Sequence, residues 1–186
     1  MLRDIISDQG ALPGIKVDKG LQPIEDCPNE TVTVGLDGLD ERLKEYSSMG
    51  AKFTKWRAVI NIGDGIPTDK CIDANMQALA DYAKCAQDNG MVPIVEPEVL
   101  MDGEHNIDQC FEATERSLKS LFSHLEKASV NIKGTLLKPN MVTSGKDATD
   151  QASVEEVAHK TLDCLIANVP AELPGITFLS GGQSDI

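Results

Sequence analysis

Short apolar segments alternate with amphipathic segments along the chain, at about 40 residues per pair. Apolar runs of this length are typical of buried strands, and amphipathic runs with a 3.6-residue period are typical of helices. Regular alternation of the two predicts right-handed βαβ units and a parallel sheet whose strands are buried on both faces. An open doubly wound sheet and a barrel both fit this pattern. We expect strands at residues 13–17, 53–62, 91–96, 130–138 and 175–179.

The amphipathic segments carry the start signals of helices. Thr68 is a candidate N-cap, and Ser153 followed by Glu156 has the spacing of a capping box. Residues 20–34 contain two prolines and an asparagine, which are breakers, so we expect a loop there. We expect helices at residues 38–48, from Thr68 to Gly90, at residues 108–127, and from Ser153 to Pro170.

The composition indicates one acidic domain. The 186 residues carry a formal net charge of −13 and are 41% hydrophobic, which suits a single soluble domain over residues 1–186. No apolar run is long enough to span a membrane, and the acidic balance argues against nucleic acid or an anionic membrane as a partner. The five cysteines and three histidines lack metal-ligand spacing, so we expect reduced thiols, a cytoplasmic location and no metal. No glycine-rich nucleotide fingerprint follows any expected strand, and we expect no cofactor.

Lys138 stands at the end of an apolar strand, directly after Leu136 and Leu137 and before Pro139. Burying an ammonium there is costly, so the position favours the neutral amine, a nucleophile that attacks carbonyls and forms imines. A surface lysine with a buried stem is the commoner explanation for an isolated lysine. The residues at the other strand ends favour the reactive interpretation.

Each expected strand carries ionisable or polar residues toward its carboxyl end or, in the second strand, along one face. The i, i+2 spacing puts Lys55 and Arg57 on the same face, and likewise Glu96 and Glu98. In a parallel barrel the strand ends converge on one mouth, where active sites lie. Cations gathered there in an acidic chain indicate an anionic ligand. The candidate residues are Lys16, Lys55, Arg57, Glu96, Glu98, Lys138, Ser180, Gly181 and Gly182.

Several of these candidates have an expected chemical role. Glycines beside Ser180 would let backbone N–H groups approach a phosphate closely, although Ser-Gly-Gly is also common in plain turns. Lys55 close to Lys138 would disfavour the ammonium form of Lys138. Glu96 is placed to move protons during imine and enamine chemistry. The alternative for Glu96 is an ion pair with either lysine, and the two roles are compatible.

Six longer segments are specific enough to compare with a known family. They are residues 14–20, 35–39, 55–57, 92–98, 134–142 and 175–184. In this order they strongly resemble class I fructose-1,6-bisphosphate aldolase, and the resemblance covers essentially the whole chain. The resemblance implies a (β/α)₈ barrel that reversibly cleaves fructose 1,6-bisphosphate to dihydroxyacetone phosphate and glyceraldehyde 3-phosphate without a metal. The family is usually tetrameric, which implies a homo-oligomer when the chain is full length.

The resemblance also implies roles for individual residues. Lys138 resembles the imine-forming lysine, and Glu96 resembles the proton-transfer carboxylate. Lys55 resembles the lysine that assists the carbinolamine and proton steps. Lys16 and Arg57 resemble residues that bind the hydroxyls and the second phosphate of the substrate. The cradle for the phosphate on the dihydroxyacetone side would be Ser180, Gly181 and Gly182.

The chain departs from the family in three places. Nothing matches the aspartate of the family's first strand, the phosphate-binding arginine of its last strand, or the tyrosine that ends its tail. The chain therefore resembles strands three to seven of eight, an incomplete single domain of about five parallel strands, and we expect low activity from it. Asn61 also stands where the family more often has a lysine.

Two alternatives fit part of this pattern. Another imine-forming barrel enzyme, such as a transaldolase or a deoxyribose-phosphate aldolase, would share the lysine at a strand end. Residues 95–98 (Val-Glu-Pro-Glu) and 179–183 (Leu-Ser-Gly-Gly-Gln) argue against that choice. A non-catalytic module that acts as a binding or scaffold protein is the alternative from a different class.

Overall fold

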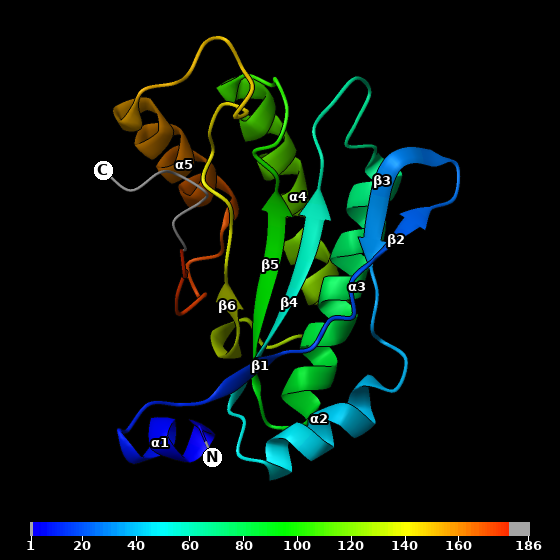
Figure 1. Ribbon diagram of the computed structural model, residues 1–186, viewed down its shortest axis with the longest axis vertical. Coiled ribbons are helices and arrows are strands. Elements are labelled where there is room, and N and C mark those ends of the chain that lie inside the picture. The colour runs from blue at the N-terminus through cyan, green and yellow to red at the C-terminus, as the bar shows by residue number, and fades with distance from the viewer. Residues whose placement is uncertain (1, 179–186) are drawn as a thin grey trace.

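The computed structural model describes residues 2–178, with side chains described from residue 4 onward. Its centre is a four-stranded parallel sheet in the order β1-β4-β5-β6, drawn in Figure 1. The fold is therefore part of an α/β barrel, with four strands in the described sheet where about five were expected. The strands are β1 (Gly14–Lys16), β4 (Phe53–Ile60), β5 (Val92–Val99) and β6 (Leu136–Leu137).

Helices alternate with the strands of this sheet, as the sequence predicted. The Thr68 hydroxyl accepts the N–H of Cys71 at 3.1 Å, and the Ser153 hydroxyl accepts the N–H of Glu156 at 3.2 Å, so both predicted N-caps are confirmed. For the predicted capping box, this bond is the Ser153 half. A short N-terminal helix, α1, was not predicted. The helices are α1 (Leu2–Asp8), α2 (Leu39–Ser48), α3 (Asp69–Asp88), α4 (Ile107–Lys127) and α5 (Val154–Asn168).

The hydrophobic core lies between the sheet and the helices α3 and α4, which run alongside β4 and β5 (Figure 1). Trp56, Val95 and Leu137 are fully buried on this face of the sheet, and Trp56 stacks on Tyr82 of α3 with ring centroids 5.4 Å apart. On the other face of β4, Phe53, Lys55 and Arg57 are only half-buried, although Val59 at the end of the strand is buried. The expectation that the strands are buried on both faces is therefore wrong for the described sheet, because the helices cover only one face.

Residues 20–34, which were expected to be a loop, form an antiparallel hairpin of β2 (Leu21–Ile24) and β3 (Cys27–Thr33). The proline of β2 lies on an edge strand. Proline is tolerated there because its missing N–H removes no hydrogen bond from a central strand. The two breakers in β3, Pro28 and Asn29, lie next to the turn, and Asn29 has a positive φ of 64°. The turn itself is formed by Glu25 and Asp26, with Asp26 at a positive φ of 62°. The breakers therefore lie within the two strands, and the prediction of a loop was wrong.

The two C-terminal strands are shorter than predicted. Residues 130–138 were expected to be one strand, but Ile132–Gly134 form a 3₁₀ turn that precedes β6. The Asn131 side chain accepts the N–H of Lys133 at 3.1 Å, and this local bond replaces strand pairing there. In the expected last strand, Ile176 makes one bridge to Leu137, and residue 179 lies outside the described part of the chain.

Candidate active site

The strand register brings the predicted lysines and carboxylates to one face of the sheet. Lys16 pairs with Lys55 across β1 and β4, and Arg57 pairs with Glu96 across β4 and β5. Val95 pairs with Leu137, and the N–H of Lys138 donates to the backbone oxygen of Val95 at 2.9 Å. Side chains at paired positions of a parallel sheet point the same way, so the candidate lysines, arginine and glutamates share the face that α3 and α4 leave uncovered.

Glu96 is the most buried ionisable group of this face, with its side chain 2% exposed. One carboxylate oxygen, Oε1, pairs with Nζ of Lys138, whose side chain is 14% exposed. The other oxygen, Oε2, pairs with Nζ of Lys55. Glu96 thus forms the ion pairs that the sequence offered as an alternative, and it forms them with both lysines. A carboxylate that bridges two amines is placed to accept a proton from one of them.

The outer cations of the face also have carboxylate partners. Nε of Arg57 pairs with Oε2 of Glu98, and this hydrogen bond raises the pKa of Arg57 above its ordinary value. Nζ of Lys16 pairs with Oδ1 of Asp18. Four cations and three carboxylates therefore meet at this end of the sheet, which leaves one formal positive charge for an anionic ligand.

Asp18 is the residue of this face that was absent from the predicted set. Its side chain is 3% exposed, and it contacts both Lys16 and the backbone of Arg57. A signal was present, because Asp18 follows Lys16 at the i, i+2 spacing that was used for the other strands. Side chains alternate between the two faces only while the chain stays extended, and β1 ends at Lys16. The i, i+2 spacing alone therefore did not place Asp18 on this face.

The remaining predicted residues lie apart from this arrangement or outside the described chain. Ser180, Gly181 and Gly182 fall outside residues 2–178, so their place relative to Lys138 stays a prediction. Asn61, which had no sequence explanation, donates from Nδ2 to the backbone oxygen of Asn29 at 3.1 Å. Asn61 therefore connects the end of β4 to the hairpin.

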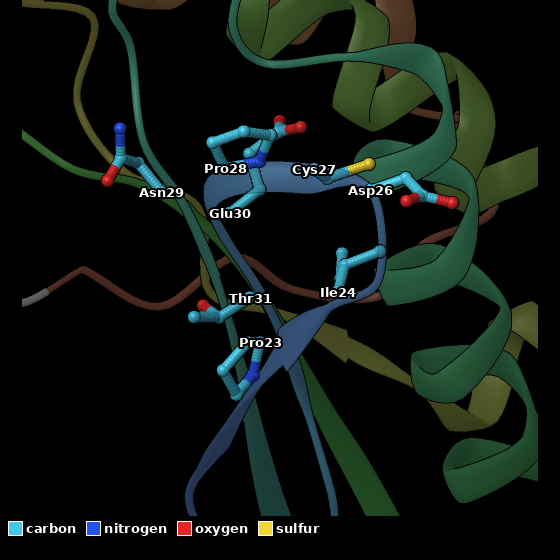
Figure 2. A pocket seen from close by; sticks show the side chains of 8 residues that line it. All are labelled: Pro23, Ile24, Asp26, Cys27, Pro28, Asn29, Glu30 and Thr31. Atoms are coloured by element: carbon cyan, nitrogen blue, oxygen red, sulfur yellow. The ribbon is translucent and has the colours of Figure 1, made fainter.

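A hollow of about 410 Å³ lies on the hairpin (Figure 2), and none of the candidate lysines is among its lining residues. All of its lining residues belong to the segment 23–31, and Glu30 among them is bonded to the backbone N–H of Thr68 at 2.8 Å and to its hydroxyl at 2.6 Å. Glu30 is thus occupied in attaching the hairpin to the start of α3. The reactive amine and its partners lie elsewhere, so this hollow is a feature of the hairpin.

Two further properties bear on the type of site. Among residues 2–178, no group of three or more His, Cys, Asp or Glu side chains is arranged to hold a metal ion. Within the same part of the chain, no helix has the length and apolar character required to cross a bilayer.

The fold and this site define a class of protein: an α/β barrel with ionisable side chains gathered at the carboxyl ends of its strands. The sequence profile of the family described as "Glycolytic: Fructose-bisphosphate aldolase class-I" matches residues 1–186. The chain therefore belongs to the class I fructose-bisphosphate aldolase family. This membership decides against the transaldolase and deoxyribose-phosphate aldolase alternatives.

Individual relatives agree with this assignment. A "Probable fructose-bisphosphate aldolase class 1" of Xanthomonas campestris is 59% identical over 97% of this chain and 54% of its own length. "Fructose-bisphosphate aldolase 4, cytosolic" of Arabidopsis thaliana is 48% identical over 98% of this chain and 46% of its own length. The aldolase of Plasmodium falciparum, solved with TRAP and a small-molecule inhibitor, superposes with a TM-score of 0.94 at 46% identity, over 97% of this chain and 52% of that one. The chain thus spans about half the length of the curated relatives that it matches.

Proposed function

We propose that this chain carries the imine-forming half-site of a fructose-bisphosphate aldolase, in which Lys138 forms a Schiff base with a phosphorylated ketose. The observation that supports this most directly is the pairing of Lys138 with a nearly buried Glu96 that also pairs with Lys55. An amine must lose a proton before it attacks a carbonyl, and Glu96 is in hydrogen-bond contact to accept that proton.

In the reaction that we propose, each of the three inner residues, Lys138, Lys55 and Glu96, has a chemical role. The free amine of Lys138 attacks the substrate's carbonyl carbon to form a carbinolamine, which loses water to give the imine. Lys55 donates a proton to the departing hydroxyl, and Glu96 carries protons between the two amines. When the hydroxyl next to the adjacent carbon–carbon bond loses its proton, that bond breaks, an aldehyde is released, and the electron pair of the bond forms the enamine of dihydroxyacetone phosphate on Lys138. The base for this proton in the family is the aspartate of its first strand, which has no match in this chain.

Binding of the substrate's anionic groups falls to the outer residues. We propose that Lys16 and Arg57 bind its hydroxyls and second phosphate, and that Ser180, Gly181 and Gly182 cradle the phosphate next to the imine. No metal or cofactor is part of this proposal. A phosphorylated sugar is the expected partner, with neither nucleic acid nor membrane involved. The proposal includes a cytoplasmic location and a homotetramer when the chain is full length.

Trapping with borohydride tests the proposal on the 186-residue chain. Dihydroxyacetone phosphate followed by borohydride should add the mass of the reduced adduct at Lys138, identified by peptide mass spectrometry. Lys138→Arg should abolish the adduct, because a guanidinium stays protonated and is not nucleophilic. Lys84→Arg is the matched control, since Lys84 is an exposed lysine on α3 that pairs with Asp88, and it should leave the adduct unchanged.

The same experiment separates the enzyme from the binding-module alternative. A chain that serves only as a scaffold would show no adduct, or adducts scattered over exposed lysines in proportion to their accessibility. Full labelling of the Lys138→Arg variant at another lysine would also contradict the assignment of the reactive amine.

A further inference from the structure

Asp18 is a nearly buried carboxylate beside the edge strand of the site. It lies two residues after Lys16, the last residue of β1, and its side chain is 3% exposed. One oxygen, Oδ1, pairs with Nζ of Lys16, and the other, Oδ2, accepts the backbone N–H of Arg57 at 3.2 Å. A single carboxylate therefore contacts two of the four cations of the face, one through its side chain and the other through its backbone.

The bond from Arg57 to Asp18 replaces a bond of the sheet. Val17 donates its N–H to the backbone oxygen of Lys55 at 3.0 Å, in the parallel pattern of β1 and β4. In an uninterrupted parallel ladder the Val17 carbonyl would accept the N–H of the residue two positions after Lys55 in β4, which is Arg57. That carbonyl instead accepts Nη1 of Arg42 at 2.8 Å, and Asp18 takes the N–H of Arg57.

Side chains consequently hold the backbone of Arg57 where its neighbouring strand has ended. The N–H of Arg57 donates to Asp18, and the carbonyl of Arg57 accepts the hydroxyl of Thr33 at 2.7 Å. The guanidinium is held separately by Glu98. The position of Arg57 on the open face therefore depends on Asp18 as well as on the strand β5.

Lys16 depends on Asp18 more directly. The Lys16 side chain is 51% exposed and forms an ion pair with Asp18. A half-exposed lysine without a partner samples many rotamers, and fixing it in one of them costs side-chain entropy. A buried, fixed carboxylate limits this sampling before a ligand arrives.

We infer that Asp18 is a positioning residue, which places Lys16 and Arg57 to bind the substrate's phosphate remote from the imine. This inference rests on the proposed function, because it assigns those two cations to a bisphosphate. Asp18 acts through its neighbours and does not touch the reacting atoms. The ligand class that it selects for is a ketose with phosphates at both ends, in preference to a triose with one phosphate.

The test compares two ligands in the borohydride assay with the variant Asp18→Asn. The substitution keeps an oxygen that can accept the N–H of Arg57, but it removes the negative charge that holds Lys16. The half-saturating concentration of fructose 1,6-bisphosphate should rise about fivefold, the size of effect expected for losing one ion pair that orders a binding group. The half-saturating concentration of dihydroxyacetone phosphate should stay within about twofold, because this ligand has no second phosphate.

Two controls make the comparison specific. Asp81→Asn removes the same charge from the exposed surface of α3 and should change neither value. Asp18→Glu restores a carboxylate and should recover part of the loss for the bisphosphate. An equal loss for both ligands would show a merely structural role, and no loss for either would show that Lys16 and Arg57 are placed without Asp18; both results would overturn the inference.

A second measurement does not depend on imine formation. Lysines labelled by reductive ¹³C-methylation give separate NMR signals, and the Lys16 signal should move to the position of a free lysine in Asp18→Asn. An unchanged Lys16 signal would overturn the inference. Absence of any adduct in the unmodified chain would instead overturn the proposed function, so the two failures are distinguishable.

Discussion

Glu96 places one nearly buried carboxylate between two ammonium groups. Burying an isolated carboxylate costs desolvation free energy. Two neighbouring cations offset this cost only when each forms a hydrogen bond with the carboxylate. Both oxygens of Glu96 are used in this way, one for Lys138 and one for Lys55. At the scale of single residues, the arrangement holds the proposed nucleophile in contact with its proton acceptor before any ligand binds.

A second buried ionisable residue, His105, leads to a prediction about pH. The residue is 6% exposed, neither ring nitrogen has a hydrogen-bond partner among the described residues, and burial lowers its pKa below the ordinary 6.5. Below pH 6.5 the unfolded chain binds a proton at this residue that the folded chain does not yet bind, so unfolding is favoured. The stability that neutral His105 contributes is thus present above pH 6.5 and is lost as the pH falls through the lowered pKa.

Urea unfolding at several values between about pH 5.5 and about pH 7.5 measures this contribution. The free energy of unfolding should fall with decreasing pH, and His105→Gln should make that fall shallower because it removes the titrating ring. His159→Gln, at an exposed position of α5, is the control and should keep the original slope. Identical slopes in all three proteins would contradict the role of His105.

At the scale of elements, the hairpin depends on contacts made by α3. Asn75 of α3 is fully buried, accepts the N–H of Thr33 at 3.2 Å and donates to the backbone oxygen of Thr31 at 2.8 Å. Glu30 of β3 accepts the N–H and hydroxyl of Thr68 at the start of α3. A two-stranded hairpin is marginal in isolation, so these side chains determine where it lies.

Asn75→Ala should therefore detach the hairpin more than it disturbs the sheet. It leaves the N–H of the buried Thr33 without its acceptor, at a cost of about 1–3 kcal/mol if that group stays dry, whereas the Thr31 oxygen keeps the Cys71 thiol as a donor at 3.8 Å. Hydrogen exchange of the Thr33 amide should accelerate strongly, while amides in β5 keep their protection. Gln77→Ala, at an exposed position of the same helix, should affect neither region, and equal acceleration in β5 would contradict this local role.

At the scale of the whole molecule, the described sheet is open, and none of the helices within residues 2–178 covers its site face (Figure 1). Catalysis of this kind depends on excluding water and on holding the substrate from several sides. We therefore expect the 186-residue chain to form the imine but to cleave fructose 1,6-bisphosphate at least on the order of 100-fold more slowly than its full-length relatives.

A coupled steady-state assay measures this difference directly. The bacterial relative that is 59% identical serves as the reference, assayed at the same concentration and temperature. Cleavage by the 186-residue chain at the rate of that enzyme would contradict the expectation. It would also show that the site face of the sheet is covered in solution, for example by a second copy of the chain.

The sequence by itself determined the features that depend on neighbours along the chain. The helices were predictable because their caps, such as Thr68 and Ser153, and their apolar periods are local. Lys138 and Glu96 were predicted as site residues for a similar reason, since each ends or interrupts an apolar strand and strand ends converge in a parallel sheet.

Only the tertiary structure decided which groups contact each other. The hairpin was hidden because its anchoring bonds join residues 38 to 44 positions apart, between β3 and α3. The double role of Asp18 was hidden because its partner Arg57 lies 39 positions away. Local patterns limit backbone conformation, whereas the choice of ion pair depends on which strands become neighbours and on how deeply each carboxylate is then buried.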